Sequence, residues 1–184
     1  MRPTLPTPPE LALPVASLTA LRQALLEEVG DDGAARALQR AGFAAGDAFF
    51  DLIARAAGGD AAQPAHIAES LFWRRLSELF AARGWGRLAH EAVHAGVGAL
   101  DSSDWIEAET AQAAQRPNCF FTTGLLANLL GRTAGADVAV MEVECRARGD
   151  LRCRFLFGGA SALEALYADL AAGRDLEASL AALR

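Results

Sequence analysis

The hydrophobic positions in the first half of the chain repeat at helical spacing. Leu18, Leu21 and Leu25 fall on one face of a segment that begins at Ser17, a favoured N-cap residue, and that Gly30 ends. Similar patterns predict three further helices before the texture of the chain changes. These helices cover about residues 32–41, 47–57 and 65–83.

Glycine and proline set the limits of this helical part. Residues 1–14 hold five of the seven prolines and carry little charge, which predicts a flexible tail. Gly42 is expected to stop the second helix, and Gly84 the fourth. We therefore expect a helical region over residues 15–84.

The remainder, residues 85–184, has short apolar runs between turn residues. The expected elements are two strands within residues 87–104 around a Gly96-Val97-Gly98 turn, a helix over 119–130, strands over 138–145 and 151–157, and helices over 163–171 and 176–183. This order predicts an α+β domain in which an antiparallel sheet packs against helices, folded as one unit with residues 15–84.

Composition narrows the class of protein. The chain has 184 residues, 52% of them hydrophobic, and a net charge of −6, which suits one folded domain with a sizeable core and disfavours binding to nucleic-acid phosphates. No uncharged apolar run of about 18 residues predicts a membrane span. Three cysteines cannot all pair within one chain, which favours a reducing, cytoplasmic location.

A predicted hairpin centred on Gly149 carries the most chemical information. It places Cys145 opposite Cys153, with Cβ atoms about 4.5–5.5 Å apart, a spacing that suits two thiolates on one metal ion. Strand alternation directs both cysteines, with Leu151, toward the core. It directs the arginines at even positions toward water, namely Arg146, Arg148, Arg152 and Arg154.

Two more ligands are available near this hairpin. Cys119 stands at the start of the preceding helix, where the helix dipole favours a thiolate. Glu142 or Glu144 could add a carboxylate, but both lie on the nominally opposite face, so a bulge or strong twist is required. Three buried thiols without a metal, and a Cys145–Cys153 disulfide, are the alternatives.

The run from Glu142 to Phe155 resembles the signature of the 4-vinyl reductase domain. With Cys119 it is similar to the zinc site of that domain in aromatic-sensing bacterial transcription activators, and the resemblance covers about residues 85–158 closely. It implies that a structural Zn²⁺ is held by Cys119, Glu142, Cys145 and Cys153. It also implies a fold shared with transport-particle (TRAPP) subunits, which have about four antiparallel strands packed against helices, commonly dimerise and hold a small apolar ligand.

We therefore expect a zinc-stabilised domain, a sensor or carrier, that binds an apolar or aromatic small molecule. Enzymatic activity is not favoured, because four protein ligands leave zinc no position for a catalytic water. A homodimer through the N-terminal helices is expected from the Leu18, Leu21 and Leu25 stripe. The candidate pocket residues, which could instead only fill the core, are Trp73, Trp105, Phe120, Phe121 and Gly124.

Two enzymatic alternatives remain. One is an enzyme or accessory protein of tetrapyrrole vinyl reduction, the reaction that gives the resembled domain its name, although no site for a hydride-donating cofactor is visible. The other is a zinc hydrolase that uses His90, Glu91 and His94, which form an H-E-x-x-H pattern. That chemistry needs a helix. On the strand expected here, the two histidines would lie about 13 Å apart.

Overall fold

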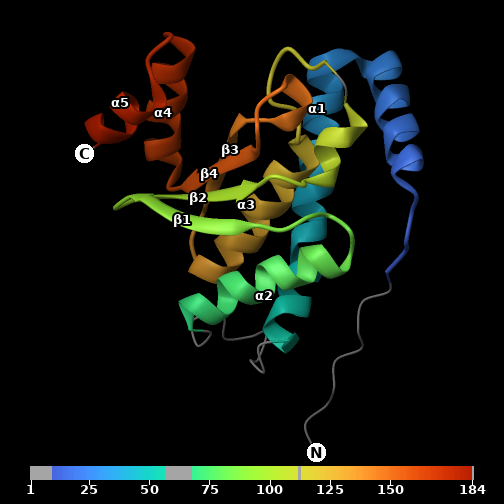
Figure 1. Ribbon diagram of the computed structural model, residues 1–184, viewed down its shortest axis with the longest axis horizontal. Coiled ribbons are helices and arrows are strands. Elements are labelled where there is room, and N and C mark those ends of the chain that lie inside the picture. The colour runs from blue at the N-terminus through green and yellow to red at the C-terminus, as the bar shows by residue number, and fades with distance from the viewer. Residues whose placement is uncertain (1–9, 57–67, 112, 184) are drawn as a thin grey trace, which may run out of the picture.

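The computed structural model describes residues 10–56, 68–111 and 113–183 (Figure 1). A four-stranded antiparallel sheet in the order β1-β2-β4-β3 packs against helices, which confirms the predicted α+β class. The strands are β1 Ala89–His94, β2 Val97–Ser102, β3 Ala139–Glu144 and β4 Cys153–Gly158. The helices are α1 Val15–Ala56, α2 Glu69–Ala82, α3 Phe120–Ala134, α4 Ala160–Ala171 and α5 Leu176–Ala182, with short 3-10 turns at Ile106–Thr110 (η2) and Arg146–Arg148 (η3).

Helix α1 contradicts the predicted series of separate N-terminal helices. The predicted break at Gly30 is present as a sharp kink, with φ 68° and ψ 176°, after which α1 folds back on itself (Figure 1). The predicted stop at Gly42 is wrong, because α1 continues to Ala56. A Cβ at Gly42 would collide with the Phe121 carbonyl, and one at Gly46 with the Asn128 side chain. These glycines let α1 approach α3 closely.

The sheet is covered on both faces. Its inner face meets α1, α2 and α3 in the larger core, whose biggest members include Phe50, Phe80, Trp105 and Phe155. Its outer face packs on α4 and α5 in a smaller core. The members of the smaller core are Val97, Ala99, Leu156, Leu163, Leu166 and Leu180.

Because β4 is central, the predicted alternation of buried and solvated residues fails along it. Arg154, expected in water, is only 6% exposed and forms ion pairs with Glu91 at 2.8 Å and Asp101 at 3.1 Å. Leu151, expected in the core, is 94% exposed in the turn before β4. Strand alternation cannot register that a second layer of helices covers the sheet.

The β1–β2 turn also differs in detail from the prediction. Val97 and Gly98 belong to β2, and the turn itself is at Ala95-Gly96. The predicted tail at residues 1–9 and the start of the helix after Pro64 lie outside the described residues. In the described part of the chain, no helix is long and apolar enough to cross a membrane.

Candidate metal centre and its surroundings

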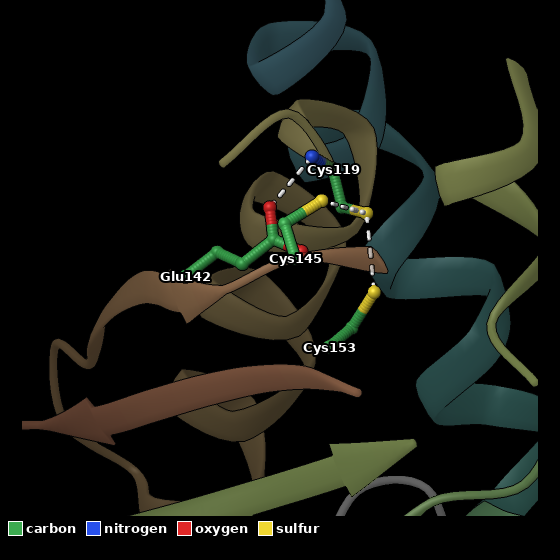
Figure 2. Close-up of side chains that lie close together, drawn as sticks. All are labelled: Cys119, Glu142, Cys145 and Cys153. Carbon is green, nitrogen blue, oxygen red and sulfur yellow. Dashed lines mark hydrogen bonds between the residues drawn. The ribbon is translucent and has the colours of Figure 1, made fainter. Parts of the chain in front are cut away.

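Three thiols and one carboxylate meet beneath the end of the β3–β4 hairpin (Figure 2). The Cys119 Sγ atom lies 3.9 Å from the Sγ atoms of both Cys145 and Cys153. With a carboxylate oxygen of Glu142, these atoms all lie within 4.8 Å of one another, and all four residues are buried. All three cysteines are free, so the structure contains no Cys145–Cys153 disulfide.

A β-bulge brings Glu142 into this cluster. In the β3–β4 register Glu142 pairs with Phe155 whereas Glu144 pairs with Arg154, so one extra residue is accommodated between them. This is the bulge that the parity of the sequence requires. It separates the two candidate carboxylates, because Glu144 forms an ion pair with Arg152 at 2.9 Å instead.

The hairpin turn holds the two strand-borne cysteines at the ends of β3 and β4. Cys145 follows β3 directly and Cys153 begins β4. Between them the chain forms η3 and then turns at Gly149, whose φ of 102° favours glycine. The Asp150 carboxylate accepts the Cys145 backbone N–H at 2.7 Å, which fixes the entry to the turn.

Cys119 is the N-cap residue of α3, and its backbone N–H donates to Glu142 Oε2 at 2.8 Å. The other carboxylate oxygen, Oε1, is buried and has no hydrogen-bond partner among the described residues. Burial, followed by the negative charge of Cys145, raises the pKa of Glu142 to about 8. Hydrogen bonds from the other two thiols lower the pKa of Cys145.

The donor set therefore lacks a cation. Buried carboxylates are stable as anions only when paired or coordinated to a metal, and a divalent ion would neutralise this group. A Zn–S distance of about 2.3 Å sets the sulfurs of a tetrahedral site about 3.8 Å apart, close to the separations seen here. The cluster could hold a metal ion.

A second buried carboxylate, Glu107 of η2, orders the start of α3. It accepts the backbone N–H groups of Phe121 at 2.9 Å and Thr122 at 2.8 Å, and it faces Arg22 of α1 at 3.9 Å. Sequence reasoning missed this capping role. Glu107 precedes α3 by 13 residues, so no local capping pattern marks it; the only signal was the family resemblance of residues 106–109.

The predicted pocket residues lie in several environments. Trp105 is fully buried, and its indole N–H donates to Thr122 Oγ1 at 2.8 Å. Phe121 stacks on Trp85, with ring centroids 5.6 Å apart, and Trp85 lies 5.9 Å from Trp105. These three rings form a continuous aromatic cluster next to the start of α3.

The other predicted pocket residues do not join that aromatic cluster. Trp73 stacks on His90 at 4.0 Å, at the β1 edge of the sheet. The Phe120 ring has the guanidinium groups of Arg22 and Arg116 at 5.7 Å each. Gly124 leaves no pocket, because a Cβ there would collide with the Gln39 carbonyl of α1.

The structure contradicts the hydrolase interpretation of the H-E-x-x-H pattern. His90, Glu91 and His94 all lie on strand β1, and Glu91 is paired with Arg154. Among the residues that the structure describes, the Cys119 cluster is the one group of three or more His, Cys, Asp or Glu with ligand atoms close enough to share a metal.

An apolar cleft of 580 Å³ lies between residues 10–15, the two halves of α1 and the end of α2. Trp85 forms part of its wall. The Glu10–Arg83 ion pair, at 2.6 Å, supplies its charged groups. The apolar side chains that line it include Leu11, Leu13, Leu18, Phe49, Leu52 and Ile106.

Comparison with known proteins agrees with this fold. The phenol-responsive sensory domain of the transcription activator PoxR, solved with phenol, has a TM-score of 0.70 at 23% identity, covering 90% of this chain and 84% of that one. A vinyl-4-reductase family protein from Methanocaldococcus jannaschii gives 0.54 at 17%, covering 80% and 82%. Trafficking protein particle complex subunit 3 from Naegleria fowleri, covalently bound to palmitic acid, gives 0.63 at 10%, covering 78% and 91%.

No curated protein matches the chain by sequence. The family model of the 4-vinyl reductase domain, by contrast, matches residues 102–158, a range that contains all four members of the Cys/Glu cluster together with β3 and β4. The chain therefore carries a 4-vinyl reductase domain over residues 102–158, within a fold that it shares with the PoxR sensory domain and the trafficking-particle subunit.

Proposed function

We propose that this protein is a zinc-stabilised binding domain, a sensor or carrier, for an apolar or aromatic small molecule. The observation that carries the proposal is the position of Trp85. Its ring lines the 580 Å³ cleft and also stacks on Phe121, two residues after Cys119. A molecule in the cleft would therefore contact a ring that packs on the helix start beside the Cys/Glu cluster.

The proposed role of zinc is structural. Cys119, Glu142, Cys145 and Cys153 supply four ligands, which is the full set of a closed tetrahedral site. Bound there, the ion would join the start of α3 to the β3–β4 hairpin and give the Glu142 carboxylate its missing partner. Free thiols suit a reducing compartment, and we place the protein in the cytoplasm.

The size and lining of the cleft support an apolar ligand. Its volume falls within the range of about 300–1,000 Å³ that small-molecule sites occupy, and its walls are mainly aliphatic and aromatic. Phenol in the PoxR domain and palmitic acid in the trafficking-particle subunit are both molecules with large apolar parts. We propose a homodimer as well, because Leu21 of the N-terminal stripe is 56% exposed.

The test is titration of the intrinsic tryptophan fluorescence with phenol, indole, palmitate and protoporphyrin. Ala48→Trp would fill the cleft, whereas Ala165→Trp adds the same side chain to an exposed position of α4 outside it. Saturable binding that Ala48→Trp removes and Ala165→Trp preserves is the expected result. If no compound binds, or if both variants bind equally, the proposed ligand site is wrong.

A further inference from the structure

Strand β3 is an edge of the sheet and forms the floor of a long groove. The sheet order leaves β3 paired with β4 alone, and a groove of 1050 Å³ follows β3 along residues 139–144. One wall is the exposed side of α4 and the start of α5. The other wall consists of Gln39, Arg116, Pro117, Phe120 and Thr123.

An unpaired edge strand offers hydrogen-bonding groups to another chain. Every second residue of β3 directs its backbone N–H and C=O away from β4, in position to pair with a further strand. Arg148 already occupies the Val143 carbonyl, with a hydrogen bond of 3.0 Å. The described part of β3 contains neither proline nor lysine, the residues that most often block edges.

The shape of the groove selects a single extended segment. Its volume lies at the upper limit for small-molecule sites, whereas a six-residue strand alongside β3 would be about 20 Å long. A second copy of this protein does not fit well, because its own β3 would be recessed between the same two walls. A segment without such walls can reach the edge.

The two walls specify the side chains of that segment. The α4 wall presents Leu163, Leu170 and Tyr167, the last 66% exposed, with Glu164 at its rim. The opposite wall presents Arg116, whose ion pair with Asp32 is exposed and therefore weak. Successive residues of a strand face opposite walls, so apolar and acidic residues would alternate.

We infer that β3 accepts, as a fifth strand, an extended segment of a partner protein in which apolar and acidic residues alternate. Main-chain pairing would supply affinity and the two walls specificity, as in other cases of strand addition. This inference goes beyond the proposed function and requires neither zinc nor a ligand in the cleft.

The test uses a capped, fluorescently labelled eight-residue peptide that alternates valine and glutamate, with fluorescence anisotropy as the measurement. We expect saturable binding and at least tenfold weaker binding of a peptide with the same composition in scrambled order. N-methylation of the valine amides and of the glutamate amides blocks opposite edges of the peptide. Only one of these two modified peptides is expected to bind.

Variants of the protein locate the binding site. Tyr167→Ala should weaken binding at least fivefold and Arg116→Ala about two- to fivefold. Leu151→Ala and Arg174→Ala are matched controls at exposed positions outside the groove and should change nothing.

Several results would overturn the inference. They are the absence of binding at millimolar peptide, full binding of both N-methylated peptides, and equal binding by groove and control variants. Light scattering tests the remaining occupant. If Tyr167→Ala abolishes self-association of the protein, the groove is an interface between copies of this chain and the inference is wrong.

Discussion

The two faces of the sheet near the β3–β4 hairpin solve the problem of buried charge in different ways. Neighbouring residues of β4 belong to the two solutions, because Cys153 joins the inner cluster while Arg154 joins the outer one. The inner cluster consists of Cys119, Glu142, Cys145 and Cys153. The outer cluster consists of Glu91, Asp101, Glu144, Arg152 and Arg154.

The outer cluster is electrically complete within the protein. Each of its two guanidinium groups contacts two carboxylates, at N···O distances of 2.8–3.1 Å. The inner cluster contains only acidic groups, and one oxygen of Glu142 has no hydrogen-bond partner among the described residues. The difference indicates that the inner cluster needs a cation from outside the chain, whereas the outer cluster does not.

Metal removal should expose this difference most strongly. We expect about one zinc per chain, and we expect Cys145→Ser to remove it with a large loss in the free energy of unfolding. Structural zinc contributes about 10–16 kcal/mol of apparent binding free energy in small zinc domains. Elemental analysis and urea denaturation measure the two effects.

The control for metal removal is His90→Ala, which lies on β1 outside the cluster and should keep the metal. Chelation that strips substoichiometric metal and leaves the denaturation midpoint unchanged would show that no ion stabilises the inner cluster.

The pH dependence of the metal-free protein should give the next largest effect. A pKa of Glu142 raised from 4.5 to about 8 means that the folded state holds a proton that the unfolded state releases. The free energy of unfolding should therefore fall as pH rises between about 4.5 and 8. Zinc-loaded protein should lack this contribution, because the metal holds the carboxylate ionised.

Urea denaturation from pH 5 to pH 8, with chelator and with zinc, measures the comparison. Glu142→Gln should flatten the profile of the metal-free protein. An unchanged profile in that variant would assign the pH dependence to other groups.

The hairpin shows how far sequence reasoning can reach and where it stops. Its register follows from Gly149 and from strand alternation, and parity showed that a bulge was needed before either glutamate could face inward. Parity could not choose between Glu142 and Glu144, since both needed the same bulge. That choice depends on the position of the extra residue, which only the backbone shows.

Errors elsewhere arose where a residue has its partner far along the chain. A glycine that ends a helix and a glycine that lets two helices approach are identical in sequence. Gly42 and Gly124 are distinguished by their contacts with Phe121 and Gln39, which lie about 80 residues away. Arg154 was placed in water for a related reason, because alternation along β4 carries no information about α4 and α5.

The outer cluster should show a moderate loss when one partner is removed. Arg154→Met takes the cation from Asp101 and leaves this half-buried carboxylate dependent on Arg152. We expect a loss of about 1–3 kcal/mol in the free energy of unfolding, the cost of leaving a buried polar group poorly paired. Urea denaturation at neutral pH measures it, with zinc content unchanged.

Glu91→Gln is the matched control in this cluster. Glu91 is paired with the same arginine but its side chain is 56% exposed, so the loss should stay below about 1 kcal/mol. If Arg154→Met costs no more than this control, the outer cluster contributes no more than a surface ion pair.

The smallest effect concerns the cap of α3, which supports the inner cluster without belonging to it. Glu107→Gln removes the charge and one of the two oxygens that accept the Phe121 and Thr122 N–H groups. Losing a helix cap costs about 0.5–2 kcal/mol. Glu109→Gln is the control on the same 3-10 turn, where the side chain is 52% exposed and paired with Arg146. Thermal and urea denaturation of both variants, with metal analysis, should show a loss for Glu107→Gln alone and full zinc content in each. Equal stability of the two variants would mean that the metal, rather than this cap, holds the start of α3.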